Sequence, residues 1–208
     1  MELVDGDHEL ARERATAIAQ EQGVRLLEDS LDIETCEGAA TIGLELVNAK
    51  PASFDTVLIA LGGGALATGV GHVLKERAPE VEVLCVQPVG APAMTRSWHQ
   101  RSVVTTESTN TIADGVAGRR PIPAVLGDLL LVADDAVLVQ KASIIAGMQM
   151  LLDRAGLAVE PSATLGIAAI LEYPDRFAGR HVVTIVCGSN VDPEAYRRWD
   201  GATSVRRP

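Results

Sequence analysis

The chain has 208 residues, of which 47% are hydrophobic and only 3% aromatic, so it can bury a sizeable core built mainly from aliphatic side chains. Its formal net charge of −10 argues against binding to nucleic acid or to an anionic membrane surface. No apolar run reaches the roughly 18 residues of a membrane span, and the acidic start lacks the features of a signal peptide.

The first fifty residues are predicted to form two helices and one short strand. Asp7 is placed to cap the first helix, in which apolar residues recur at helical spacing until Gly23 ends the pattern. Residues 24–27 form an apolar run short enough for a strand, and residues 35–49 have the apolar face of a helix.

The middle of the chain begins with an apolar strand, followed by three glycines and a helix. The strand covers residues 57–61, the helix residues 65–78, and a second strand residues 81–86. Residues 88–118 show little periodicity and are rich in Gly, Pro, Ser, Thr and Asn. We therefore predict a long irregular loop there, of the kind that usually has a function.

The rest of the sequence continues to alternate strands and helices. The predicted helices cover residues 123–131, 141–154, 162–171 and 193–199, and the predicted strands cover residues 136–139 and 181–186. Because the strands are short and uniformly apolar, the pattern predicts an α/β fold, a doubly wound and mostly parallel sheet with helices on both faces.

The glycines after the first buried strand are the strongest functional signal. Gly62, Gly63 and Gly64 permit positive φ angles and close backbone approach, and Ala65 and Leu66 open the following helix. A helix N-terminus presents unpaired N–H groups and a partial positive charge, so this turn predicts an anion site, most often a phosphate cradle. The alternative is a tight packing turn without a ligand.

A second turn, at residues 187–190, follows the last predicted strand. Ligands of parallel sheets bind beyond the carboxyl ends of the strands, so the two turns could line one pocket. The chain has three cysteines, Cys36, Cys85 and Cys187, with no CxxC spacing, which argues against a disulfide framework or a zinc site. A reducing cytoplasm fits this usage best.

Five stretches, in order and at matching spacing, resemble motifs of the fold-type II pyridoxal-phosphate enzymes, especially the threonine and serine dehydratases. They are residues 62–66 (GGGAL, for GGGGL), 86–91 (VQPVGA, for VEPxGA), 111–115 (TIADG), 159–162 (VEPS, for an EP(S/A)G helix entry) and 187–192 (CGSNVD, for SGGNVD). Each motif alone is weak evidence, but together they cover nearly the whole chain. The resemblance therefore implies the fold, the cofactor and the division of the chain.

The resemblance divides the chain into three parts. Residues 1–50 would be a remnant of the family's smaller domain with a crossover helix, and residues 51–195 would be the α/β domain that binds the phosphate of pyridoxal 5′-phosphate. Residues 196–208 are basic and would form a flexible tail.

The resemblance also gives roles to individual residues. The backbone N–H groups from Gly62 to Leu66 would hold the cofactor phosphate, and Cys187 would lie at the pyridine nitrogen. A neutral thiol there would leave the nitrogen largely unprotonated, which suits β-elimination of a hydroxyl. Glu160 would stand near the ring and Asn190 would brace the turn. By residue type alone, Cys187 is a small buried hydrophobe and Glu160 a charge at a helix start.

The family's chemistry requires a lysine that forms a Schiff base with the cofactor aldehyde. The resemblance places this lysine, and the loop that holds the substrate carboxylate, in an N-terminal part that this sequence does not contain. Lys50 precedes a strand at the wrong end for the site, and Lys75 lies on a predicted solvated helix face. Lys141 is only a remote catalytic candidate, and we expect it at the surface.

The sequence also departs from the family at a cation site. Some members bind a cation through a carboxylate in the VEP position and another six residues on, where this chain has Gln87 and Ala93. Hard cations prefer carboxylate oxygens, so we predict a weak cation site or none.

The expected function is the cofactor domain of a serine or threonine dehydratase-like lyase that removes the β-hydroxyl of an amino acid and releases ammonia and a 2-oxo acid. A complementary N-terminal chain would have to complete it, and we expect a homo-oligomer. Two alternatives are a non-catalytic module that binds pyridoxal phosphate or another phosphate ligand, and an inactive remnant. A Rossmann dinucleotide domain is disfavoured, because the second strand ends at Gln87 rather than at an acidic residue for the ribose hydroxyls.

Overall fold

The computed structural model describes residues 2–6, 8–28, 30–49 and 54–200. The predictions for Asp7, for Lys50 and for the tail beyond residue 200 lie outside these residues. The described elements are α1 (His8–Gln22), α2 (Ile33–Asn48), β1 (Thr56–Ala60), α3 (Ala65–Arg77), β2 (Glu82–Pro88), α4 (Ala93–Gln100), α5 (Pro123–Val132), β3 (Asp135–Val139), α6 (Lys141–Ala155), α7 (Leu165–Glu172), α8 (Pro174–Phe177), β4 (Val182–Thr184) and α9 (Pro193–Asp200), with 3₁₀ turns at Asp114–Val116 and Pro161–Thr164.

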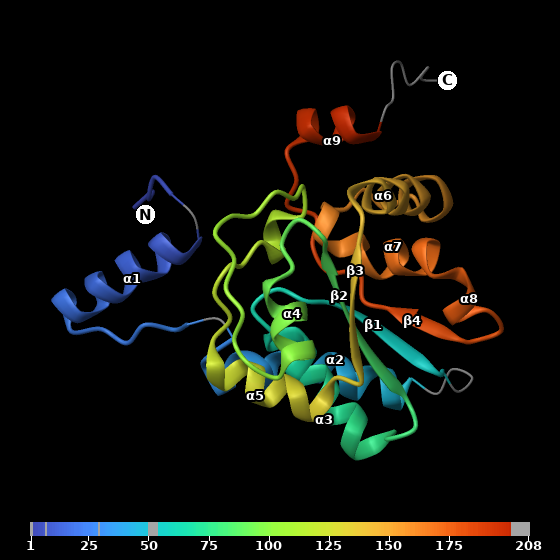
Figure 1. Ribbon diagram of the computed structural model, residues 1–208, viewed down its shortest axis with the longest axis horizontal. Coiled ribbons are helices and arrows are strands. Elements are labelled where there is room, and N and C mark those ends of the chain that lie inside the picture. The colour runs from blue at the N-terminus through green and yellow to red at the C-terminus, as the bar shows by residue number, and fades with distance from the viewer. Residues whose placement is uncertain (1, 7, 29, 50–53, 201–208) are drawn as a thin grey trace.

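The described strands form one parallel sheet in the order β3-β2-β1-β4. Helices separate the strands along the chain and lie on both sides of the sheet (Figure 1). The predicted α/β fold is therefore confirmed. The order reverses between β1 and β4, and this switch point is where parallel sheets usually bind ligands.

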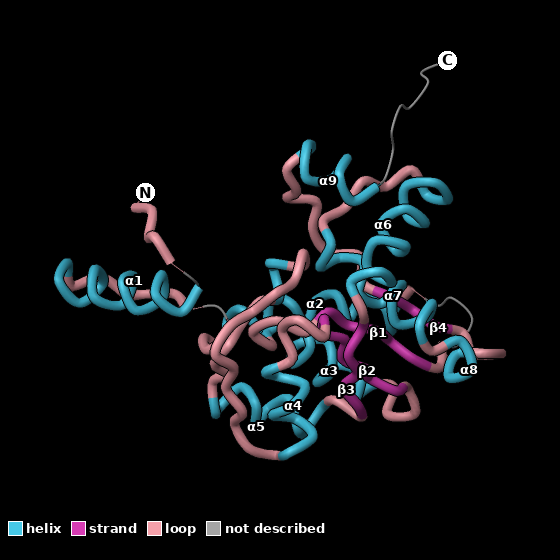
Figure 2. The backbone as a smooth tube through the Cα atoms, turned by 45° about the horizontal axis from the view of Figure 1, so that its top comes forward, coloured by secondary structure: helices cyan, strands magenta, loops and turns pink. Residues whose placement is uncertain are grey.

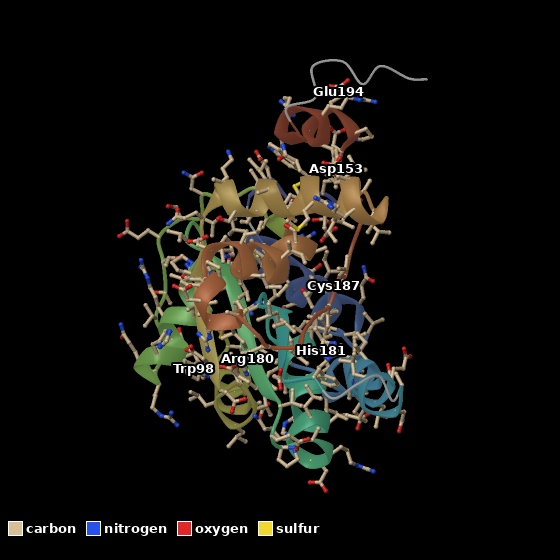
Figure 3. The ribbon with its side chains drawn as sticks, turned by 90° about the vertical axis from the view of Figure 1, so that its right-hand side faces the viewer. Trp98, Asp153, Arg180, His181, Cys187 and Glu194 are labelled. Carbon is tan, nitrogen blue, oxygen red and sulfur yellow. The ribbon has the colours of Figure 1, made fainter. Side chains whose placement is uncertain are left out.

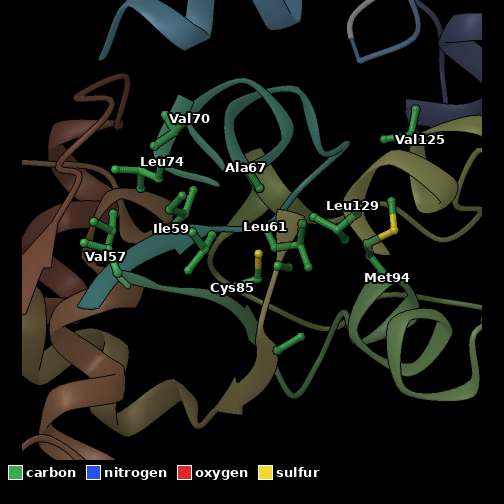
Figure 4. Packing of buried hydrophobic residues seen from close by; sticks show 14 of the residues in the cluster. Val57, Ile59, Leu61, Ala67, Val70, Leu74, Cys85, Met94, Val125 and Leu129 are labelled. Atoms are coloured by element: carbon green, nitrogen blue, oxygen red, sulfur yellow. The ribbon is translucent and has the colours of Figure 1, made fainter. Parts of the chain in front are cut away.

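Successive side chains of β1 point to opposite faces of the sheet, and a separate hydrophobic core lies on each face. Val57 and Ile59, with Leu61 just beyond the strand, point to the face covered by α2, α3, α4 and α5 (Figure 4). Leu58 points to the opposite face, where it packs with residues of α6, α7 and α8. Both faces are covered, which is why the strands are uniformly apolar.

The helices α2 and α3 cross closely because glycines lie at their contact. A Cβ atom added to Gly69 of α3 would lie 2.2 Å from the Cys36 carbonyl oxygen of α2, and one added to Gly43 would lie 2.9 Å from Val73 Cβ. Because glycine has no side chain, the backbones of α2 and α3 can approach each other closely at these two positions.

The amino ends of the strands are joined by ion pairs. Arg176 and Arg180 each place a guanidinium nitrogen 2.6 Å from the Glu82 carboxylate, and Arg176 lies 2.7 Å from Asp135. Burial raises the pKa of Glu82, but its hydrogen bonds and charge interactions with the two arginines outweigh this effect and hold the pKa below its ordinary value. The amino ends of the strands are thus stabilised by ion pairs within the protein.

Three predicted elements differ from the structure. Residues 24–27 form no strand, because this segment lies outside the sheet with Val24 and Leu27 more than half exposed. The predicted loop 88–118 contains helix α4, whose first turn is completed by the Gln87 side-chain oxygen, 2.9 Å from the Thr95 N–H. The last strand is shorter than predicted, Val182–Thr184 in place of residues 181–186.

Two views show α1 extending to one side of the molecule, apart from the sheet (Figures 1 and 2). One contact of this helix with the body is made by Glu9, which is 4% exposed and accepts hydrogen bonds from the Arg119 and Arg120 N–H groups at 2.6 and 3.1 Å. No helix in the part of the chain that the structure describes is both long and apolar enough to cross a bilayer.

We predict that Gly69→Ala lowers the free energy of unfolding by about 1–3 kcal/mol, because the new methyl group forces α2 and α3 apart. Gly127→Ala is the matched control: Gly127 is exposed in α5 with open space at its Cβ position, so this change should stabilise the fold by about 0.5–1 kcal/mol. Urea unfolding of both variants measures the difference. Equal effects would contradict the close crossing.

Candidate functional site

The turns after β1 and β4 meet at the switch point of the sheet. They line one cavity of about 320 Å³, together with residues from α2 and from the turns near residues 115 and 162. The cavity contains every predicted cofactor-binding residue except Asn190, namely Gly62, Gly63, Gly64, Ala65, Leu66, Glu160 and Cys187. Tertiary structure thus brings residues from three distant parts of the sequence to one place.

The glycine turn has the geometry of an anion cradle. Gly64 caps α3 with a φ of 115°, and a Cβ atom there would lie 2.5 Å from Val125 Cγ1. Within the described chain, the N–H groups of Gly62, Gly63, Gly64 and Leu66 donate to no protein acceptor. Unpaired donors at a helix start attract anionic oxygens, so the turn fits a phosphate group.

Glu160 organises the opposite wall of the cavity. Its carboxylate accepts a hydrogen bond from the Asn190 backbone N–H at 3.0 Å, and its own N–H donates to the Gly188 carbonyl at 3.3 Å. A Cβ atom on Gly188, whose φ is 114°, would lie 2.6–2.8 Å from the Glu160 carboxylate. Asn190 is exposed and contributes this backbone group, so Glu160 holds the turn in which Cys187 lies.

Cys187 is half-buried between β4 and α9 (Figure 3). Burial raises the pKa of its thiol, and the Glu160 carboxylate raises that pKa further, since a nearby negative charge disfavours the thiolate. A neutral thiol therefore faces the cavity at neutral pH.

Two serines in the cavity were not among the predicted site residues. Ser162 is 4% exposed, and its hydroxyl has no hydrogen-bond partner within the described structure. A Cβ atom on Gly115 would lie 2.9 Å from this hydroxyl. Ser162 lay within the VEPS motif, whereas no sequence signal indicated Ser30, which also lines the cavity.

A second, larger cavity of about 350 Å³ adjoins the first. Both are lined by Ser30, Gly62, Gly63, Gly115 and Val116. The second cavity also contains residues of α1 and Asp114 of the TIADG stretch, whose carboxylate accepts a hydrogen bond from the Gly115 N–H at 3.0 Å.

The described lysines lie away from both cavities. Lys141 is exposed at the first residue of α6 and lines neither cavity. Lys75 does not lie on a freely solvated face as predicted, because its ammonium group lies 2.5 Å from the Asp134 carboxylate and 3.4 Å from the Val81 carbonyl.

Gln87 and Ala93, which stand where some family members have the carboxylates of a cation site, make other contacts in this structure. Gln87 is 1% exposed and its amide oxygen accepts the Thr95 N–H, and Ala93 is buried in the first turn of α4. The described residues include no cluster of three or more His, Cys, Asp or Glu that could hold a metal ion.

The family profile described as "Pyridoxal-phosphate dependent enzyme" matches residues 1–188. The chain belongs to this family. The resemblance to fold-type II enzymes is thereby confirmed, and pyridoxal phosphate is the cofactor of these proteins. The free donors of the glycine turn and the unpaired Ser162 hydroxyl fit such a ligand.

Individual members of the pyridoxal-phosphate family show the same relationship. Serine racemase of Oryza sativa is 33% identical over 86% of this chain and 53% of its own length, and L-threonine ammonia-lyase of Thermotoga maritima is 30% identical over 88% and 45%. The structure of threonine deaminase isoform 2 from Solanum lycopersicum superposes with a TM-score of 0.89 at 27% identity, over 96% of this chain and 55% of that one. The chain spans about half the length of the curated relatives it matches.

We predict that Glu160→Gln lowers the pKa of the Cys187 thiol, because the change removes the nearby negative charge while the amide oxygen can still accept the Asn190 N–H. The pH dependence of iodoacetamide labelling, followed by peptide mass spectrometry, should shift to lower pH. The control Glu76→Gln, on an exposed face of α3, should leave it unchanged. An unchanged profile in Glu160→Gln would show that this carboxylate does not act on the thiol.

Proposed function

We propose that this chain is the cofactor-binding large domain of a threonine or serine dehydratase-like amino-acid lyase. The observation that supports it is the convergence of the glycine turn, Glu160 and Cys187 on one cavity at the switch point between β1 and β4. The relationship to the L-threonine ammonia-lyase of Thermotoga maritima agrees with this proposal.

The chain's own residues would perform three tasks. The N–H groups from Gly62 to Leu66 would hold the phosphate, aided by the partial positive charge at the start of α3. Cys187 would face the pyridine nitrogen as a neutral thiol and leave it without a proton. Glu160 would fix the position of Cys187 through the Asn190 and Gly188 backbone groups.

When bound, pyridoxal phosphate supplies an electron sink for breaking bonds at the α-carbon and β-carbon of an amino acid. The reaction would release ammonia and a 2-oxo acid from serine or threonine. No described lysine lines the cavity, so we further propose that a complementary segment supplies the lysine that binds the cofactor aldehyde.

A second candidate is racemisation of serine, favoured by the 33% identity to the Oryza sativa protein named serine racemase. The same cavity would hold the cofactor in both cases. Adding the complementary segment and measuring 2-oxo acid and D-serine as separate products distinguishes the two reactions.

Binding of the cofactor is the first test. We predict that Gly64→Ala weakens pyridoxal phosphate binding about 10-fold or more, because its φ of 115° and its 2.5 Å approach to Val125 exclude a side chain and distort the cradle. A spectrophotometric titration measures the affinity. Gly156→Ala is the control, because Gly156 also has a positive φ but lies at the end of α6 with open space around it. Equal affinities in the two variants would refute the cradle.

The second test concerns the lysine. We expect that borohydride treatment of the isolated chain with stoichiometric pyridoxal phosphate leaves no lysine adduct, whereas a segment carrying the catalytic lysine, added in trans, acquires one. Mass spectrometry of the peptides identifies the modified residue. An adduct on Lys141 of the isolated chain would overturn its surface assignment.

A further inference from the structure

Ser30 lies inside the cofactor cavity in an unusual conformation. It belongs to the segment between α1 and α2, is 5% exposed, and has a φ of 69°. Left-handed backbone is unfavourable for a residue with a Cβ atom, so the surroundings must hold Ser30 in this state.

The Ser30 hydroxyl already occupies one donor of the phosphate cradle. Its Oγ accepts the backbone N–H of Ala65, the first residue of α3, at 3.3 Å. The neighbouring N–H groups of Gly64 and Leu66 donate to no acceptor in the described structure. A neutral oxygen of the protein thus lies where the proposed function requires an oxygen of the cofactor phosphate.

A phosphate oxygen and the Ser30 hydroxyl would compete for the same N–H group. The phosphate oxygen is the stronger acceptor because it is charged, and the helix N-terminus favours negative charge. The hydroxyl bond is long for an N–H donor, which makes it the weaker competitor.

The turn that carries Ser30 can leave the cradle without losing its internal bonds. The Leu31 and Asp32 N–H groups both donate to the Glu28 carbonyl, at 3.2 and 3.0 Å, and the Asp32 carboxylate accepts from Glu28 N and Arg25. Leu31 is 48% exposed. Among the residues that the structure describes, this turn is hydrogen-bonded to the cradle through the Ser30 hydroxyl, which accepts the Ala65 N–H.

We propose that Ser30 is a built-in competitor of the cofactor, which occupies the Ala65 N–H until the phosphate displaces it and which thereby couples cofactor binding to a movement of residues 30–32. This inference rests on the proposed function, because it takes the ligand to be the phosphate of pyridoxal phosphate. Since Ser30 lines both cavities, its displacement would change the lining of both.

The test compares Ser30→Ala with the wild-type chain in pyridoxal phosphate titrations. We expect the variant to bind roughly 3- to 10-fold more tightly, which corresponds to removing one competing neutral hydrogen bond. Ser30→Gly also lacks the hydroxyl and tolerates the positive φ, so it should bind more tightly than the wild type even if the alanine variant folds poorly. Ser108→Ala, on an exposed loop, is the matched control and should bind as the wild type does.

Amide hydrogen exchange gives a second measurement on the wild-type chain. Addition of pyridoxal phosphate should slow exchange at residues 62–66 and accelerate it at residues 30–32. Weaker binding by Ser30→Ala, or protection of both segments, would identify Ser30 as a ligand of the phosphate and overturn the inference. Unchanged affinity would overturn it too, while leaving the proposed function in place, whereas a failure of wild type and variants alike to bind would overturn both.

Discussion

The unpaired N–H groups at the start of α3 are the feature on which the rest of the site depends. They exist because three glycines follow β1 and Leu61 and the chain then turns directly into a helix, with Gly64 at a φ that other residues rarely adopt. Gly64 is buried, and a buried polar group without a partner is unfavourable, so an anionic ligand would stabilise this turn. The Ser30 hydroxyl beside Ala65 satisfies one of these donors.

The amino and carboxyl ends of the strands differ in how their polar groups are satisfied. At the amino ends, Arg176 and Arg180 neutralise Glu82 through close ion pairs, and these charges are satisfied within the protein. At the carboxyl ends, the backbone N–H groups of the glycine turn and the Ser162 hydroxyl remain without protein partners in the described structure. Ligands of open α/β sheets bind beyond the carboxyl ends of the strands, which is where these unsatisfied groups lie.

Glu160 links the chemistry of the site to its shape. Its carboxylate holds the turn after β4 through the Asn190 N–H and lies against Gly188, where a side chain would not fit. The same negative charge, with burial, keeps the Cys187 thiol neutral. One side chain therefore holds the turn of the group proposed to face the cofactor ring and adds to the effect of burial on its thiol.

The sequence by itself determined the parallel α/β fold, the family and the cofactor, because short apolar strands, glycine turns and ordered motifs are local features. It missed α4, whose first turn depends on the Gln87 side chain, and it placed a strand at residues 24–27, which lie outside the sheet that the described strands form. Only the tertiary structure decided that Ser30 reaches Ala65, that Ser162 faces the cavity and that Lys75 pairs with Asp134. These contacts join residues distant in the sequence, and their partners are fixed by packing rather than by any local pattern.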